Sequence, residues 1–245
     1  NSNVYLNCAN ALQASLLNVM PNANITIITN DDLPEGDLAP NSDWKLINDV
    51  QVYEASPYDY TIKLEADLII TRDISYWWDV LSYRDLVVSS TIRNFRGEVS
   101  ESKFYRKFII DNKLPDVYNA ITYFKKSNTS EEFFMLVQNI FDNWNEYKRM
   151  LRCDPDEVAT TDWVYAIASH IMGVEKTTLP TFTDMSMVHM KMMINGTPSE
   201  DWTDLFVYEV FPEVLRVNTV PQMYPFHYHI KTFADKIDEN LYARY

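Results

Sequence analysis

The fold is decided by the segment TIKLEADLII, residues 61–70. Its apolar and β-branched residues predict a strand over residues 61–64, and two carboxylates, Glu65 and Asp67, follow at the end of that strand. Ligands of α/β proteins bind at such strand ends, and carboxylate oxygens suit hard cations such as magnesium and manganese. The segment is therefore compatible with a metal site in an α/β protein. Taken alone it is a weak signal, because two acids one residue apart also occur by chance in so acidic a chain, and solvated carboxylates at a strand end are the alternative.

Predicted helices and strands alternate along the chain on both sides of this segment. Apolar residues at helical spacing begin at Val4, and short β-branched runs bounded by turn-forming residues follow. The predicted helices cover residues 4–19, 102–110, 130–150 and 160–171, the last capped by Thr160 or Thr161. Strands are predicted at residues 25–29, 50–54, 61–64, 86–88 and 117–124, with strand-like pieces near 205–210, 215–218 and 226–230 and a loop at 33–43. The alternation predicts an α/β fold in one domain spanning residues 1–245.

Composition narrows the classes of function. The chain of 245 residues is 47% hydrophobic, which is enough to bury a substantial core. It contains only 4 glycines, so the glycine-rich loops that cradle phosphate are absent, and any bound phosphate would have to be neutralised by a metal and by side chains. The formal net charge of -14 argues against tight, general binding of nucleic acid.

Basic residues are concentrated in one part of this acidic chain. They are Arg93, Arg96, Lys103, Arg106, Lys107 and Lys113. We expect a solvated helix face here, because charged side chains usually lie at the surface. A local basic binding face is the alternative.

The cysteines and the apolar runs of the sequence bear on the compartment in which the protein works. Cys8 and Cys153 are the two cysteines, and neither a disulfide framework nor a zinc site is expected from them. Their scarcity favours a reducing, cytoplasmic compartment. No apolar run approaches the roughly eighteen residues of a membrane span, so no such span is expected.

The acidic pair is embedded in a longer pattern. Its parts are Pro57-Tyr58-Asp59, Lys63-Leu64-Glu65-Ala66-Asp67, Ile69-Ile70 and Asp73-Ile74-Ser75-Tyr76-Trp77-Trp78. This pattern resembles the metal-binding segment of GT-A glycosyltransferases, especially the glycogenin-like and bacterial galactosyltransferase-like family. The resemblance implies a Rossmann-like mixed sheet of GT-A type flanked by helices, and a divalent cation, Mn²⁺ or Mg²⁺, that holds a nucleotide-sugar, with a UDP-sugar favoured. Asp67 would then be the main metal ligand, and Glu65, which stands where the family has an aspartate, the weaker one.

Three later segments resemble the same family in the same order. They are residues 117–124, 159–166 and 225–231. In the first, Asn119 would hydrogen-bond the hydroxyls of the donor sugar, and a strand-edge or turn asparagine is the alternative. In the second, Asp162 would present its carboxylate to the reacting centre, and the alternative is a favourable charge or cap at the start of a helix.

The last of these segments carries two histidines and a lysine. By resemblance, His227 or His229 completes the metal shell, and Lys231 meets the diphosphate. Alternation with a period of two would turn both histidines to one side, so the sequence does not choose between them. The residues expected to hold the nucleotide-sugar are Lys63, Glu65, Asn119 and Lys231. The family's first strand, which contacts the nucleotide base, would precede residue 1.

The implied reaction transfers a sugar to an acceptor hydroxyl, with retention of configuration in the resembled family. The acceptor stays open among a glycan, a protein, a lipid-linked sugar and a modified DNA base. Asp162 would position or stabilise the sugar in a retaining reaction and act as a general base in an inverting one. Two other functions stay open: a sugar-phosphate nucleotidyltransferase, which normally carries a glycine-rich N-terminal loop, and a non-catalytic carbohydrate-binding module, because abundant Tyr and Trp also suit sugar stacking.

Overall fold

Three antiparallel strands form the central sheet of the molecule. The computed structural model describes residues 2–29, 48–101, 105–154, 156–179, 182, 184–212 and 214–237. Within it, β1 (Tyr60–Leu64), β6 (Tyr118–Lys125) and β3 (Leu86–Ser89) lie in the order β1-β6-β3. β6 pairs with both neighbours, and Leu64 at the end of β1 lies opposite Ile121. The acidic motif, Leu64-Glu65-Ala66-Asp67, therefore begins beside the middle of β6, a buried central strand.

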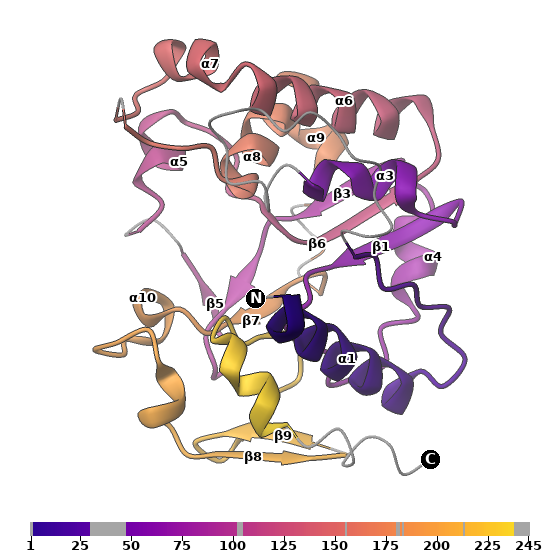
Figure 1. Cartoon of the computed structure of the whole chain (residues 1–245), viewed down its shortest axis with the longest axis vertical. Coiled ribbons are helices and arrows are strands. Elements are labelled where there is room, and N and C mark those ends of the chain that lie inside the picture. The colour runs from indigo at the N-terminus through magenta and orange to yellow at the C-terminus, as the bar shows by residue number, and fades with distance from the viewer. Residues whose placement is uncertain are drawn as a thin grey trace.

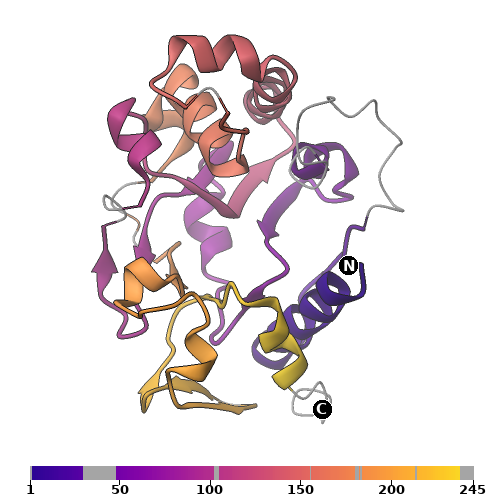
Figure 2. The ribbon, with the colours of Figure 1, turned by 60° about the vertical axis from the view of Figure 1, so that its left-hand side comes forward.

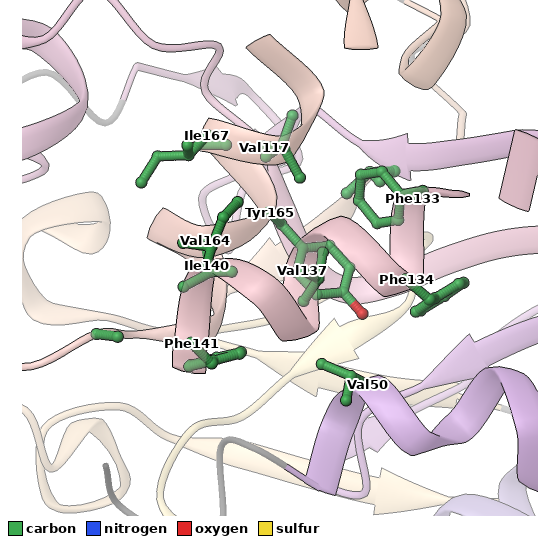
Figure 3. Packing of buried hydrophobic residues seen from close by; sticks show 14 of the residues in the cluster. Val50, Val117, Phe133, Phe134, Val137, Ile140, Phe141, Val164, Tyr165 and Ile167 are labelled. Carbon is green, nitrogen blue, oxygen red and sulfur yellow. The ribbon is translucent and has the colours of Figure 1, made fainter. Parts of the chain in front are cut away.

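One face of this sheet is covered by α6 (Asn128–Asp142) and α8 (Thr161–Met172), as Figure 1 shows. Phe124 of β6 points into the cluster of side chains that fills this space. Figure 3 shows the aromatic and branched residues contributed by the two helices, among which the rings of Phe133 and Tyr165 lie 5.2 Å apart between centroids. Burial of this apolar area is the main force that holds the helices on the sheet.

The opposite face of the sheet packs against α1 (Ser2–Val19) and α4 (Trp77–Leu81). Val88 and Phe124 point toward α6 and α8. Their neighbours along the strands, Val87 and Tyr123, point the other way and pack in a second cluster with Leu16 of α1. Successive residues of a strand point to opposite faces, so a strand buried on both faces reads as a continuous apolar run. The result is a mixed α/β architecture with helices on both sides of the central sheet.

A second, mixed sheet begins directly after the acidic motif. It contains β2 (Leu68–Ile69), β11 (Phe226–His227), β7 (Met187–His189), β4 (Ile92–Arg93) and β5 (Val99–Ser100), in that order. β7 is parallel to both β11 and β4, whereas the outer pairs, β2 with β11 and β4 with β5, are antiparallel. Because β1 belongs to the first sheet and β2 to the second, the acidic motif lies at the junction between them.

The last part of the described chain packs beneath this second sheet. β8 (Tyr208–Phe211), β9 (Val214–Val217) and β10 (Val220–Pro221) form an antiparallel meander. It is followed, after β11, by the short helix η4 (Lys231–Lys236), which lies beside α1 in both Figure 1 and Figure 2. The N-terminal helix therefore supports the C-terminal segment that carries the two histidines.

Short helices complete the described structure. They are η2 (Asn48–Gln51), α3 (Val52–Ala55), α5 (Lys107–Asp111), α7 (Trp144–Met150), α9 (Val174–Thr177), α10 (Met192–Asn195) and η3 (Trp202–Asp204). The predicted strands at residues 61–64, 86–88 and 117–124 and the predicted helix at 4–19 are confirmed. The helix predicted from Thr160 is also confirmed as α8, and the side chain of Thr160 caps it by accepting a hydrogen bond from Trp163 N.

The strand predicted at residues 50–54 is wrong, because these residues are helical in η2 and α3. Val50 and Tyr53 are both buried, and a spacing of three residues places them on one side of a helix. The predicted strand at residues 25–29 is also wrong, because this run has no regular structure. The predicted loop at residues 33–43 lies outside the described residues. Of the helix predicted at 102–110, the described part forms only α5, from Lys107.

The single helix predicted at residues 130–150 is instead two helices, α6 and α7. They meet at Asn143, whose side-chain Nδ2 donates a hydrogen bond to Asn139 O. Such a local bond from side chain to backbone competes with the regular helix pattern. The first of them, α6, begins two residues earlier than predicted, and the side chain of Ser127 caps it by accepting from Ser130 N.

The described chain contains no helix that is both long and apolar enough to cross a membrane. Cys8 and Cys153 are both free thiols, as the sequence predicts. Near the C-terminal end, the predicted strand pieces correspond to β8, β9 and the short β11, which ends at His227 rather than continuing to residue 230.

Candidate metal centre

Asp67 lies at the junction of the two sheets and is almost fully buried. Just before it, Glu65 N donates to Ala120 O of β6, and just after it the chain enters β2. The side chain of Asp67 is only 6% exposed. A carboxylate in such a position requires positive or hydrogen-bonding partners to offset its lost hydration.

The C-terminal segment supplies those partners. β11 pairs with β2 so that His227 lies opposite Leu68, and Tyr228 N donates to Asp67 O. This pairing sets His227 Nε2 at 2.9 Å from Asp67 Oδ2 across 160 residues of sequence. Lys231 Nζ donates to the same carboxylate oxygen and to His229 O. Two segments that are 160 residues apart in sequence thus meet at the buried carboxylate of Asp67.

His229 reaches the same place by a different backbone conformation. The predicted alternation stops at His227, because His229 adopts a left-handed backbone with φ 63°. Left-handed conformations are uncommon for residues other than glycine and concentrate at functional sites. Asp67, His227 and His229 nevertheless each offer a ligand atom within 4.8 Å of the others. Both histidines of the tripeptide therefore lie at the acidic motif.

His189 is a fourth member of this group that sequence reasoning missed. It ends β7, whose parallel pairing with β11 places His189 beside His227. The two Nδ1 atoms lie 3.0 Å apart, and His189 is buried. Its sequence surroundings, Met187-Val188-His189-Met190, form an apolar run with no ligand spacing. Only the register between β7 and β11 brings it to the site, and that register leaves no local signal.

The electrostatics of the cluster divide its histidines into two kinds. Burial alone would lower the pKa of His227, but the adjacent Asp67 carboxylate raises that pKa above its ordinary value. Burial, with the positive neighbours His227 and Lys191, lowers the pKa of His189 well below 6.5. Burial and Lys191 also lower the pKa of His229 to about 4. At neutral pH, His189 and His229 are therefore neutral, whereas His227 keeps its proton to a higher pH than an ordinary histidine does.

The Asp67 carboxyl is the counterpart of that proton. Burial alone would raise its pKa, but His227 and Lys231 hold the pKa of Asp67 well below its usual range. The acid is therefore ionised and ready to accept a cation. If His227 loses the proton on Nε2 and keeps the one on Nδ1, Nε2 and Asp67 Oδ2 become two acceptors 2.9 Å apart, which needs a positive charge between them.

These residues fit a divalent metal ion. Neutral His189 can accept a hydrogen bond from Nδ1 of His227, which leaves Nε2 as the metal-binding atom. One carboxylate and two imidazoles form a donor set that suits first-row transition metals, including manganese. The donor atoms already lie close together, so a cation would replace the proton of His227 without moving elements of the fold.

Glu65 lies at the rim of this centre rather than within it. Its Oε2 is 3.6 Å from His227 Nε2, and its side chain is 31% exposed. Burial raises the pKa of Glu65, and the positive charges of Lys63 and His227 oppose that effect. The three residues that converge most closely are Asp67 and the two histidines, so Glu65 is a supplementary ligand position.

The other residues singled out in the sequence line one connected path beside Glu65. Lys63 Nζ donates to Asn119 O at 3.0 Å, and Asn119 N donates to Asp162 Oδ1 at 2.9 Å. Asn119 itself is buried. The charge of Asp162 also acts on the Glu65 carboxyl, which shows that the start of α8 faces the acidic motif. The structure thus brings β1, β6 and α8 to the same place as the C-terminal histidines.

Asp162 is not the cap of its helix, since Thr160 has that role. Instead its Oδ2 pairs with Arg106 Nη2 at 3.3 Å. Arg106 is only 5% exposed, hydrogen-bonds Asp116, and lies 4.3 Å over the ring of Tyr118. The expected solvated face is therefore wrong for Arg106.

Arg93 is also buried, and its Nε donates to Ser186 Oγ at 2.9 Å. The solvated face expected for the basic cluster is therefore wrong for this residue too. Lys103, another member of that cluster, lies outside the described residues.

Comparison with known proteins adds no assignment to this geometry. No family model, no curated protein and no solved structure matches this chain.

Proposed function

We propose that this protein is a divalent-metal-dependent glycosyltransferase of GT-A type that uses a nucleotide-diphosphate sugar, with a UDP-sugar favoured. The observation that carries the proposal is the convergence of Asp67 with His227 and His229, which follow it by some 160 residues yet offer ligand atoms within 4.8 Å of it and of each other. Lys231 and Lys63 add positive charge beside them. A cation and lysines next to a strand-end acidic motif suit the diphosphate of such a donor.

In this proposal, Asp67, His227 and His229 hold the metal, with Glu65 at the rim. A bound cation would neutralise the diphosphate and stabilise it as a leaving group. Lys231 Nζ, which donates to Asp67 Oδ2, would turn its charge toward the diphosphate when a cation occupies the carboxylate. The nucleotide-sugar would then be held by one metal ion and by cationic side chains. These would take the place of a glycine-rich phosphate-binding loop, which a chain with only 4 glycines lacks.

Asp162 is the residue best suited to act on the sugar. A hydrogen bond from Asn119 N and an ion pair with Arg106 Nη2 hold its carboxylate at the start of α8, and 35% of its side chain stays exposed. A carboxylate held in one orientation can stabilise positive charge that develops on the sugar, the role expected in a retaining transfer. Asn119, next to it on β6, would contribute its side-chain amide to the sugar hydroxyls.

The order of the elements supports the GT-A comparison at the level of the fold. The acidic motif joins β1 to β2, β6 lies beside β1, and Asp162 at the start of α8 accepts from Asn119 N of β6, so the segments that resemble the family lie together in space.

The direct test is release of nucleoside diphosphate. Purified protein is incubated with a panel of UDP-, GDP- and ADP-sugars, with and without manganese, and the diphosphate and free sugar are measured. We expect manganese-dependent hydrolysis of at least one donor, abolished in Asp67→Asn. A parallel incubation with pyrophosphate separates the alternatives, because a nucleotidyltransferase would form nucleoside triphosphate. Manganese binding without turnover of any donor would contradict the proposal and favour a binding module.

A further inference from the structure

A cavity of about 350 Å³ lies away from the Asp67 centre, at the opposite ends of the same two strands. Asp67 comes before β2 and Arg72 after it, while His227 ends β11 and Tyr224 comes before it. Because β2 and β11 are antiparallel, Arg72 and Tyr224 meet at the end remote from the metal centre. Thr71 Oγ1 donates to Tyr224 O at 3.1 Å and joins the two segments there. The cavity is therefore a separate feature of the second sheet.

The walls of this cavity are fixed to one another. Gln222 Nε2 donates to Phe95 O at 2.9 Å, which joins the segment before β11 to the turn between β4 and β5. The guanidinium of Arg93 lies 4.0 Å over the ring of Tyr224. In the same turn, the side chain of Asn94 accepts from two backbone amides and sets the position of the next residues. The cavity is thus preformed, as small-molecule sites usually are.

Two arginines line this cavity without an acidic partner. They are Arg72 and Arg96, and no Asp or Glu is among the lining residues. Neither guanidinium makes a hydrogen bond or ion pair anywhere in the part of the chain that the structure describes. The chain has 35 acidic and 21 basic residues, yet none of its carboxylates lines this cavity. The unpaired cations leave the cavity suited to an anion.

The cavity also offers a hydrogen-bond acceptor. Gln222 is buried, and its Oε1 accepts no hydrogen bond among the described residues. The orientation of the amide is fixed, because Nε2 donates to the carbonyl oxygens of Phe95 and Val220. A buried acceptor without a donor is costly, so such groups usually find a ligand or water. A hydroxyl group of a ligand would supply the missing donor.

We propose that this cavity binds a small phosphate monoester with a hydroxylated body, such as a sugar phosphate. Two arginines match the charge of a phosphate dianion, and each guanidinium presents a fork of donors to its oxygens. The volume exceeds what an inorganic ion needs and falls within the range of small-molecule sites. The hydroxylated body would lie toward Gln222 and Tyr224. Binding here requires neither a metal ion nor a nucleotide-sugar.

Calorimetric titration tests this assignment in EDTA, so that no metal attracts the anion elsewhere. The probes are glucose 1-phosphate, inorganic phosphate, glucose and glucuronate. We expect glucose 1-phosphate to bind most tightly and glucose not to bind. Arg72→Gln and Arg96→Gln should each weaken glucose 1-phosphate at least about tenfold, whereas Arg152→Gln, which removes an equal charge from an exposed position after α7, should not.

Several outcomes would overturn the proposal. Absence of binding at about 10 mM glucose 1-phosphate would do so, because such an affinity is too weak to be specific. Equal or tighter binding of inorganic phosphate or glucuronate would exclude a phosphate ester as the ligand class. Binding that survives both arginine substitutions but is lost in Lys231→Met would place the anion at the Asp67 centre instead. The unfolding temperature of each variant verifies that its fold is intact.

Discussion

Two buried charge clusters lie beside each other in this molecule and are built in opposite ways. Around Arg106 the cation is the buried partner, at 5% exposure, and its carboxylates, Asp116 and Asp162, are 40% and 35% exposed. Around Asp67 the anion is the buried partner, and the charge opposite it is partly a proton on His227. A metal ion cannot replace the guanidinium of Arg106, but it can replace the proton on His227. The first cluster therefore fixes the structure, whereas the second can take up a metal.

Among the substitutions that test this contrast between the two clusters, we expect the largest loss of activity from a change at Asp67. Asp67→Asn removes the ionised oxygen that faces His227 and Lys231, so we expect metal-dependent turnover to fall at least about a hundredfold. The fold should survive, because His227 can become neutral and Lys231, at 27% exposure, can turn to water. Manganese titration and the unfolding temperature measure the two effects. Full manganese-dependent turnover in this variant would mean that the metal site is elsewhere.

Arg106 should show the converse behaviour, a loss of stability. Arg106→Gln leaves Asp162 and Asp116 without their shared cation and opens space under Tyr118. Because both carboxylates can still reach water, we expect a cost of about 2 kcal/mol rather than the larger cost of a fully buried pair. Urea denaturation measures it, with Arg149→Gln on the exposed face of α7 as the control. A variant as stable as the native protein would show that this cluster has no structural role.

The two histidines of the C-terminal segment offer a finer test. His227→Ala should weaken manganese about 30-fold in the presence of nucleoside diphosphate, and His229→Ala less, because only His227 lies directly on Asp67 with His189 behind it. If neither substitution weakens manganese, the C-terminal segment does not contribute to metal binding.

The pH dependence of the native protein follows from the same proton. The pKa of His227 is raised, so the proton is retained to a pH above 6.5 and competes with the metal there. Manganese affinity should therefore fall as pH drops through that raised pKa, measured by titration between about pH 6 and pH 8. An affinity independent of pH over this interval would contradict a role for protonated His227.

The smallest effect is expected at the rim. Glu65→Gln keeps the shape of the side chain and removes a charge that lies 3.6 Å from His227 but outside the closest group of ligands. We expect manganese affinity to fall by about threefold, the effect of losing one partly solvated charge. A loss as large as that of Asp67→Asn would make Glu65 an equal ligand and shift the centre toward solvent.

Much of the architecture could be predicted because its signals are local. The apolar run around Asp67 predicts a strand, and a cap at Thr160 or Thr161 predicts the start of α8, where the structure assigns the cap to Thr160. The strand assignment at residues 50–54 failed because a short apolar run has the same composition in a helix and in a strand. The long predicted helix failed because a single Asn143 side chain competes for a backbone carbonyl.

The site was predictable only where its residues carry motifs. His227, His229 and Lys231 lie within a short segment, so their joint role could be inferred by resemblance. His189 and Arg106 could not be assigned, because their positions depend on strand register and on packing between distant elements. The left-handed backbone of His229 is a further case, since no neighbouring glycine or proline announces it.

The distance in sequence between Asp67 and His227 has a consequence for the order in which the protein matures. His227 follows Asp67 by 160 residues, so at roughly 5 to 20 residues per second the ribosome makes Asp67 roughly 8 to 32 seconds before its partner. Until β11 is released and pairs with β2, that carboxylate must stay hydrated and the edge of β2 unpaired. The junction of the two sheets is therefore completed last, and a nascent chain that stalls before β11 exposes a strand edge to chaperones rather than a competent metal centre.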